Sequence, residues 1–441
     1  MDFIADFISG VNWNIWLPIV CVVWLALHNM PIWLAIMGGV LPYFLILQPM
    51  LPSQIAAQRV IAVLENTSYM AIPFFVTAGA IMSYSGISNR LLDLADAIVG
   101  HLAGGLGHVN VLMSVMMGGI SGSAAADAAF DCKFLVPEMS KRGYDKNFSA
   151  AVTIASGLIT PIIPPGMGLI IFAFATEISV GKMFAAGYVP GILCMILMMV
   201  YVHWVSKKKG YKGSRDKMAS PKEFMSLLRK AFWALLVPFG IVLGMRGGMF
   251  TATEAGAILC FYAGVVGAFC YKELKWKHLW PIIRESVLGT GSVVILIACA
   301  NSLSYFLTYE RVPQALAAFM LDANLTKWSF ILLTNVILLF IGMFMDGGPA
   351  MVILGPLLMP IAIKLGIDPI QFGIMFVFNL GIGNMSPPFG IVLYQVIGLL
   401  NLKYTEVCKA VMPFLLIMLI VLAIIALCPD LILFIPNLLY G

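Results

Sequence analysis

The stretch "LGIGNMSPPFGIV", residues 380–392, contains the residues that decide the fold of this chain. It lies inside 34 consecutive residues without a charge, from Pro369 to Leu402. A helix of about 20 apolar residues covers the roughly 30 Å hydrocarbon core of a bilayer, so this segment can span one. Its centre nevertheless holds Gly, Asn, Ser and two prolines, which break helices and leave backbone polar groups unpaired. The sequence therefore predicts a membrane-spanning segment that is broken at mid-depth.

The composition of the whole chain is that of a polytopic, all-α membrane protein. Of its 441 residues, 61% are hydrophobic and only 11% are charged, whereas soluble domains carry about 25% charged residues. The apolar runs are long and continuous rather than alternating, which favours helices over a β-barrel. The net charge of +5 follows from the distribution of charge among loops, so the sequence indicates no nucleic-acid partner. The eight cysteines form no CxxC pair, and we interpret them as small buried residues.

The hydrophobic pattern divides the chain into three kinds of segment. Residues 147–178 and 369–402 are predicted as broken spans. Residues 104–140 and 328–364 each contain an apolar helix, a Gly/Ser/Asp-rich tip and a second helix, a pattern that predicts re-entrant hairpins packed inside protein. Amphipathic connectors, at about 88–101 and 311–322, precede the hairpins. Full spans are predicted at about 13–29, 31–51, 68–85, 183–206, 231–245, 251–271, 286–308 and 406–428.

The distribution of basic residues predicts the orientation. We place the polar loop 207–230 in the cytoplasm, and each hairpin enters and leaves the membrane on the same face. The cytoplasmic segments then hold 20 of the 26 Lys and Arg residues, as the positive-inside rule requires. This arrangement places both termini outside and makes the two hairpins enter from opposite faces.

The two halves of the chain repeat. A shift of 223 residues aligns Gly143 with Gly366, Asp145 with Asp368, Pro164-Pro165 with Pro387-Pro388, and Pro190 with Pro413. Most of these matches are Gly or Pro, which fix backbone shape rather than hydrophobicity. The tips "SGSAAADAAF" (121–130) and "MDGGPAM" (345–351) align only if the second hairpin has four extra residues. Opposite entry of the hairpins makes this an inverted-topology repeat.

Inverted repeats with broken helices at equivalent positions are typical of secondary transporters. A break frees carbonyls at one half-helix end, which can coordinate a cation, and N–H groups at the next, which can face an anion. Thr160, Asn384 and Ser386 add side-chain oxygens suited to sodium. The tips add Ser121, Ser123 and Asp127 in the first hairpin, and Asp346 with Gly347 and Gly348 in the second. Two intramembrane carboxylates, each opposite a Pro-Pro break, indicate two cation sites around a shared substrate site.

Other readings of these residues remain open at this point. Prolines in membrane helices also produce simple kinks, and Asp127 and Asp346 could cap hairpin N–H groups instead of binding ions. Asn301, in "CANSLS" (299–304), could hydrogen-bond between helices or contact a ligand. An intramembrane enzyme would need Ser121 or Ser386 beside a histidine, but none of the five histidines falls in a tip or a break. We therefore expect no enzymatic activity.

The chain resembles the large membrane subunit, DctM type, of the tripartite ATP-independent periplasmic (TRAP) transporters. The motifs that carry the resemblance are "GGISGSAAADAAF" followed by "LVPEM" (135–139), "ITPIIPPGMGLIIFAFATEISVGKMFAAGYVPGIL" (159–193) and "MDGGPAMVILGPLLMPIAIKLGIDPIQFGIMFVFNLGIGNMSPPFGIVLYQ" (345–395). The resemblance covers nearly the whole chain. No Walker pattern GxxxxGK[ST] occurs, in agreement with transport that uses no ATP.

The resemblance implies an elevator-type fold, in which two hairpins and two broken helices move against a scaffold. It implies sodium-coupled uptake of a small organic acid of the dicarboxylate, sialic acid or sugar-acid class, with no cofactor besides sodium ions. It also implies two protein partners, a small four-helix membrane subunit and a periplasmic substrate-binding protein, in the lipids of a bacterial inner membrane. The alternative function is a stand-alone sodium/dicarboxylate-type transporter of related fold, and coupling to protons instead of sodium stays open.

The resemblance carries functional residues over to this chain. The first sodium site would comprise Ser121, Ser123, Asp127, Thr160, Pro161 and Pro164, and the second Asp346, Gly347, Gly348, Gly383, Asn384 and Ser386. The substrate pocket would comprise Ser123, Pro165, Asn301 and Pro388. We expect five segments: scaffold helices with an amphipathic arm (1–103), a transport hairpin and broken helix (104–182), scaffold helices with the loop 207–230 and a second arm (183–326), a second transport hairpin and broken helix (327–404), and a C-terminal scaffold helix (405–441).

Overall fold

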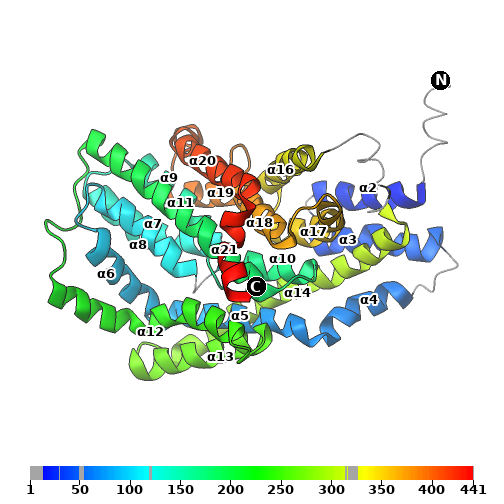
Figure 1. Cartoon of the computed structure of the whole chain (residues 1–441), viewed down its shortest axis with the longest axis horizontal. Helices are drawn as coiled ribbons and strands as arrows, with labels where there is room; N and C mark the ends of the chain where they lie inside the picture. Colours follow the sequence, from blue (N-terminus) through cyan, green and yellow to red (C-terminus); the bar gives the residue numbers. More distant parts are fainter. Residues whose placement is uncertain are drawn as a thin grey trace.

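The computed structural model describes residues 13–28, 30–48, 54–118, 122–312, 315 and 326–440, and these residues are almost entirely helical, as predicted (Figure 1). The elements of the first half are α2 (Trp13–Leu27), α3 (Ile32–Pro42), η1 (Tyr43–Leu47), α4 (Gln54–Glu65), η2 (Thr67–Met70), α5 (Ala71–Tyr84), α6 (Ile87–Val99), α7 (Gly105–Gly118), α8 (Ala124–Lys141), α9 (Lys146–Gly157), α10 (Met167–Ala175) and α11 (Val180–Lys209). Those of the second half are α12 (Pro221–Arg246), α13 (Ala252–Val265), η3 (Val266–Cys270), η4 (Trp276–His278), α14 (Leu279–Tyr309), α16 (Lys327–Phe344), α17 (Gly347–Lys364), α18 (Pro369–Met385), α19 (Ile391–Leu400), α20 (Tyr404–Leu427) and α21 (Pro429–Tyr440).

Many of these helices have the length and apolar composition of membrane spans. Among the described residues, six are long and apolar enough to cross a bilayer, or up to eight if each of two bent helix pairs counts as one span. The six include α16 and α17, which the sequence predicts as the arms of a hairpin. Large apolar side chains lie on outer faces, such as Phe261 at 76% and Leu332 at 68% exposure. In a membrane, lipid chains would cover such side chains.

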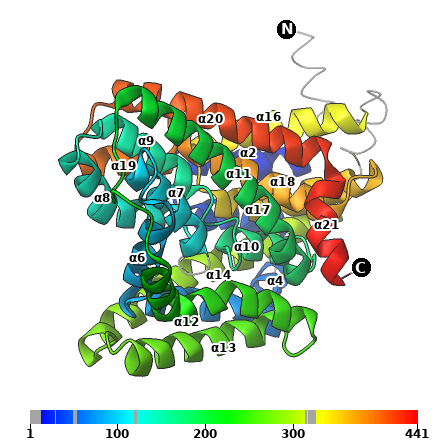
Figure 2. The same ribbon diagram turned by 60° about the vertical axis from the view of Figure 1, so that its left-hand side comes forward.

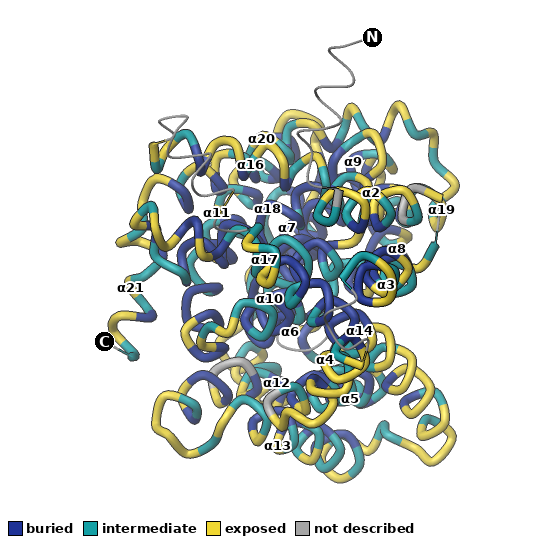
Figure 3. Tube along the Cα trace, turned by 90° about the vertical axis from the view of Figure 1, so that its right-hand side faces the viewer, coloured by how far each residue is buried: buried dark blue, intermediate teal, exposed yellow. Residues whose placement is uncertain are grey.

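The centre of the molecule is formed by the two segments predicted as broken spans. Their first halves, α9 and α18, are buried on nearly all sides, and Figure 3 shows buried residues gathered in the central helices. The helices α12 and α13 form an edge of the molecule in Figures 1 and 2, away from α9, α18 and α20. Between α5 and α6 the chain bends by 69°, so the predicted connector 88–101 is a helix set across its neighbour.

The predicted repeat appears in the local geometry of both halves. Asp145 caps α9 by accepting from the Phe148 N–H, and Asp368 caps α18 in the same way. Gly143 and Gly366, which precede these caps, both have positive φ, at 81° and 72°. This is the left-handed conformation that glycine adopts most readily. The two Pro-Pro bonds, Pro164-Pro165 and Pro387-Pro388, are both cis.

The predicted alignment of the two hairpin tips is wrong. The helices α8 and α17 are both 18 residues long, and their first and last residues are 223 positions apart. No four-residue insertion is therefore needed. The residue that corresponds to Asp346 is Ser123, since each is the N-cap of its helix, and Asp127 corresponds to Ala350.

Several element boundaries differ from those expected. Lys207, Lys208 and Lys209 form the last turn of α11, where they face the negative end of the helix dipole. Ser220 caps α12 and Pro221 occupies its first turn, so the connecting loop spans only 210–220. The helix α4 was not predicted, and Cys428 separates α20 from α21, which begins at Pro429. Most of the predicted second connector, 311–322, lies outside the described residues.

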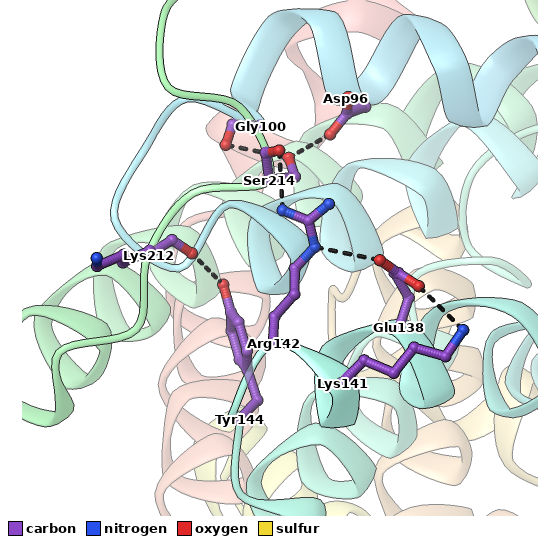
Figure 4. A network of polar contacts seen from close by, with 8 residues as sticks. All are labelled: Asp96, Gly100, Glu138, Lys141, Arg142, Tyr144, Lys212 and Ser214. Carbon is purple, nitrogen blue, oxygen red and sulfur yellow. Dashed lines mark hydrogen bonds and ion pairs between the residues drawn. The ribbon is translucent and has the colours of Figure 1, made fainter.

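The short loop between α11 and α12 binds the ends of two other helices (Figure 4). Arg142, at the end of α8, donates to the Ser214 carbonyl at 2.9 Å. Tyr144 donates to the Lys212 carbonyl at 2.7 Å. Burial raises the pKa of the Tyr144 phenol to about 12, so this group remains a hydrogen-bond donor at neutral pH. On the other side, the Ser214 hydroxyl donates to Asp96 of α6, and the Ser214 N–H donates to the Gly100 carbonyl.

Candidate functional site

The tip of the first hairpin contacts the break of the first broken helix. The Gly122 carbonyl, in the tip, accepts from the Met167 N–H at the start of α10, at 3.4 Å. Gly118 ends α7 so close to the break that a Cβ added there would lie 2.5 Å from Cβ of Ile163. The Ser123 hydroxyl caps α8 by accepting from the Ala126 N–H. Ser121, the other predicted tip ligand, lies outside the described residues.

Asp127 lies in the first turn of α8 and is fully buried. One carboxylate oxygen, Oδ2, accepts a hydrogen bond from the Thr160 hydroxyl at 2.7 Å, which joins α8 to the first break. The other oxygen, Oδ1, has no partner among the described residues. A buried carboxylate is costly unless a cation or a proton compensates it. The structure thus brings together two predicted ligands, Asp127 and Thr160, with one oxygen left free for a further partner.

A second buried acid, Asp131, was not singled out from the sequence. It lies one helical turn after Asp127 on the same face of α8, because residues four apart share a helix face. Both of its carboxylate oxygens are buried and without a partner in the described part of the chain. The sequence signal that could have identified Asp131 is its position four residues after Asp127, which places two acids on one face of the same helix.

Each half also contains a buried asparagine that joins the first hairpin helix to the broken helix. In the first half, the Asn110 amide donates to Thr153 Oγ1 at 2.8 Å, and the Ser156 hydroxyl donates to Asn110 Oδ1 at 2.7 Å. In the second half, the Asn379 amide donates to both the carbonyl and the side chain of Asn335. These residues were missed, because their partners are more than 40 positions away in the chain.

The tip of the second hairpin carries Asp346, which is the N-cap of α17. Its Oδ1 accepts from the Gly347 N–H at 2.8 Å. The same carboxyl interacts with the Asn384 amide at the end of α18, and the Oδ1 of Asn384 is buried without a partner among the described residues. The Ser386 hydroxyl donates to the Ile382 carbonyl at 2.7 Å. Gly383 packs so closely on Gly342 of α16 that an added Cβ would lie 2.5 Å from Cα of Gly342. The second tip therefore contacts the second break.

Two substitutions of Asp346 distinguish its role as the N-cap of α17 from the role of its negative charge. We expect Asp346→Ala to lower the free energy of unfolding by about 1 kcal/mol, because the cap of α17 is lost. Asp346→Asn should leave it nearly unchanged, since asparagine caps as well as aspartate does. Thermal unfolding of the purified protein in detergent measures both values. Equal stability of the alanine and asparagine variants would contradict the capping role.

In both breaks a backbone carbonyl lies against a glycine. A Cβ added to Gly166 would lie 2.0 Å from the Pro161 carbonyl oxygen, and one added to Gly390 would lie 2.6 Å from that of Asn384. Because glycine has no side chain, the backbone can pass close to these carbonyls at or just beyond the end of the first half-helix, which have no partner within the helix. The first Pro-Pro pair is buried, whereas Pro388 is exposed and its carbonyl accepts from the Tyr404 hydroxyl at 2.9 Å. The candidate cation ligands of this region are thus carbonyl, hydroxyl and carboxylate oxygens, which suit hard cations.

The two halves exchange contacts at their tips. The Gln395 amide of α19 donates to the Ala125 carbonyl in the first turn of α8, at 3.1 Å. Reciprocally, Gly348 in the second tip lies beside Ile171 of α10, whose Cδ1 would be 3.9 Å from an added Cβ. Each tip therefore contacts its own break and also the second half-helix of the other repeat. We call α7–α10 together with α16–α19 the tip-and-break unit.

Of the predicted pocket residues, Pro165 lies beside Gly122 of the first tip, which Ser123 follows in the chain. The carbonyl of Pro165 lies 3.1 Å from a Cβ built on Gly122, which precedes Ser123. The Asn301 amide, in contrast, donates to the Arg59 carbonyl at 2.8 Å and joins α14 to α4. In the structure, Asn301 thus makes the contact between helices that the sequence left open as its alternative role.

Comparison with known proteins supports the resemblance noted from the sequence. Residues 19–431 match the family described as tripartite ATP-independent periplasmic transporter, DctM component. The chain is 39% identical over 375 residues to a protein of Oleidesulfovibrio alaskensis named isethionate TRAP transporter permease protein DctMQ, covering 85% of this chain but only 59% of that relative. It is 36% identical over 398 residues to the sialic acid TRAP transporter large permease protein SiaM of Vibrio cholerae, covering 90% of this chain and 93% of the relative.

The fold is also similar to that of a solved membrane protein. The structure of Neisseria gonorrhoeae MtrF, whose title assigns it to a class of antimetabolite efflux pumps, aligns with a TM-score of 0.63. The alignment covers 85% of this chain and 84% of MtrF, at 12% sequence identity. At that identity the similarity concerns the fold alone.

Proposed function

This chain belongs to the DctM component family of the tripartite ATP-independent periplasmic transporters, and we propose that it is the permease subunit of a sodium-driven importer of a small organic acid. Isethionate and sialic acid, named for two relatives, are both organic acids, and this supports the substrate class. The main supporting observation is that a tip carboxyl lies against a helix break in each half. The buried Asp127 accepts from Thr160, and Asp346, which is exposed, interacts with Asn384.

We assign one sodium ion to each tip. At the first, the free Oδ1 of Asp127 and oxygens of the segment 160–164 are the proposed ligands, together with Ser121 and Ser123. At the second, the proposed ligands are the oxygens of Asn384, Ser386, Asp346 and the adjacent glycine backbone at 347, 348 and 383. Each proposed site contains a single carboxylate, so one sodium ion would cancel the charge of that carboxylate.

The exchange of contacts between the halves supports a movement of the tip-and-break unit as one body. Gln395 fastens the second half to the first tip, and Gly348 packs on α10. The remaining helices would form the scaffold, and the substrate would lie between the breaks, near Ser123, Pro165 and Pro388. Asn301 is the weakest member of this proposed pocket, because its amide is already bound to the Arg59 carbonyl.

The family membership supports two protein partners, a small membrane subunit and a periplasmic binding protein that delivers the substrate. We further propose a bacterial inner-membrane location with both termini on the periplasmic side, from the charge distribution of the loops. The alternative is a stand-alone sodium/carboxylate transporter. The two proposals differ in whether uptake needs the binding protein.

The test is uptake of radiolabelled organic acids into proteoliposomes that contain this chain and its small subunit, with the binding protein outside. We expect uptake with an inward sodium gradient and almost none when potassium replaces sodium. A pH gradient imposed without sodium should not restore it. Unchanged uptake in sodium-free buffer would refute sodium coupling, and full uptake without the binding protein would favour the stand-alone transporter.

A further inference from the structure

A cavity that includes no residue of either tip lies between α6, α12 and the segment that follows η3. Its volume is about 480 Å³, and its lining includes Arg90, Asp93, Arg229, Lys230, Trp233 and Tyr271. The helices α6 and α12 lie together at the edge of the molecule in Figure 2. None of these residues belongs to the tip-and-break unit, so transport chemistry does not account for the cavity.

One wall of the cavity is held in place by specific contacts. The Arg90 guanidinium donates to Glu273 Oε1 and to the Gly86 carbonyl, both at 2.7 Å. It also lies 3.9 Å from the centre of the Tyr271 ring, within the range of a cation–π contact. The Tyr271 hydroxyl in turn donates to the Lys230 carbonyl at 2.8 Å and so joins this wall to α12.

The charges in the cavity leave an excess of one positive charge. Arg90 is neutralised by Glu273 in the ion pair. Arg229 and Lys230 are exposed, and neither forms an ion pair with any other described residue. Asp93 provides one negative charge against these two. The cavity therefore complements a ligand with a single negative charge, such as one phosphodiester.

The cavity lies where apolar helices end. In the first part of α12 the last charged residue is Lys230, and the next charged residue in the helix is Arg246. After η3 the sequence becomes "YKELKWKH" (271–278). Directly next in sequence to the lining residues Trp233 and Cys270, Phe232 is 50% and Phe269 is 73% exposed. A basic cavity that continues into an exposed apolar surface has the two properties of a phospholipid site, a place for the headgroup and a place for the acyl chains.

We propose that this cavity binds an anionic phospholipid with a single phosphodiester, of the phosphatidylglycerol type. The phosphate lies between the side chains of Arg229 and Lys230, and Trp233 lies at the level of the glycerol backbone, as aromatic residues do at membrane interfaces. The acyl chains pack on Phe232 and Phe269. The fixed wall of Arg90 and Tyr271 closes the far side of the headgroup.

The experiment measures lipid binding to the purified full chain, and it is independent of transport. Phosphatidylglycerol is added to the protein in detergent, and binding is followed by native mass spectrometry and by the shift in melting temperature. The double variant Arg229→Gln/Lys230→Gln should bind about tenfold more weakly, because each basic residue near a membrane surface contributes to anionic lipid binding. The matched control Lys207→Gln/Lys222→Gln removes two cytoplasmic-side charges outside the cavity and should bind like the original protein.

Asp93→Asn provides a test that does not depend on the folding of the double variant. Removal of this carboxylate raises the net charge of the cavity, and we expect about fivefold tighter binding. Glycerophosphoglycerol, the soluble headgroup, distinguishes a lipid from a free phosphate ester, and it should not compete at equal concentration. The proposal is overturned if the soluble headgroup competes fully, if phosphatidylcholine binds equally well, if the control variant loses as much binding as the double variant, or if Asp93→Asn changes nothing.

Discussion

Replacing Asp127 with asparagine should lower sodium-driven uptake by at least about 100-fold. Residues that merely orient a metal ligand already contribute 10- to 100-fold to metal affinity, so loss of a charged direct ligand should cost at least as much. Asparagine keeps the size of the side chain and can still accept from the Thr160 hydroxyl, which now lies 2.7 Å from Oδ2. The fold should therefore persist. Initial rates of uptake across a range of sodium concentrations measure the loss.

The matched control for this variant is Asp131→Asn. Asp131 is equally buried, lies on the same helix one turn away, and has no described contact with either break. Its uptake should stay within about threefold of the original protein. Its stability should not decrease, because removing an unpaired buried charge is not costly. If both variants lose uptake equally, burial of charge in α8 matters rather than the contact of Asp127 with the break.

Gly166→Ala should abolish uptake and lower the free energy of unfolding by about 1–3 kcal/mol, the usual range for an overpacked site. The added methyl would lie 2.0 Å from the Pro161 carbonyl oxygen and 2.6 Å from its carbon. Both atoms belong to the backbone of the break, so they cannot rotate away as a flexible side chain could. The first break must then open, which displaces the carbonyls proposed as sodium ligands.

Gly398→Ala is the control, because nothing lies within 4 Å of a Cβ added there inside α19. Alanine is favoured over glycine in a helix by about 1 kcal/mol, so this variant should be as stable as the original protein or more so. Melting temperature and uptake are measured side by side for both variants. Equal behaviour of Gly166→Ala and Gly398→Ala would show that the close approach in the break is not required.

The sequence predicted the parts of this fold that depend on local backbone chemistry. The breaks at Pro164-Pro165 and Pro387-Pro388 follow from the conformational limits of proline. The equivalence of Gly143 with Gly366 follows from the left-handed turn that precedes each broken helix. The Asn110 and Asn335 contacts could not be predicted, because an asparagine in an apolar helix does not indicate which distant residue it faces.

The hairpin alignment was wrong for an instructive reason. The sequence comparison aligned the two tips with four extra residues in the second hairpin, which places Asp127 opposite Asp346. The structure pairs Ser123 with Asp346, since a helix N-cap requires an acceptor oxygen and serine and aspartate both supply one. Asp127 thus has no acidic counterpart in the second half, where Ala350 takes its place. The two proposed ion sites are related in position but not in ligand set.

The loop that joins α11 to α12 is held by its peptide carbonyls as well as by its side chains, of which Ser214 and Arg215 both contact Asp96. Arg142 and Tyr144 both donate to main-chain oxygens, those of Ser214 and Lys212. Every amino acid carries such an oxygen, so relatives could exchange the residue at position 212 freely and still keep the loop docked. The side chains that specify these two contacts are therefore those of Arg142 and Tyr144, which lie outside the loop that they fasten.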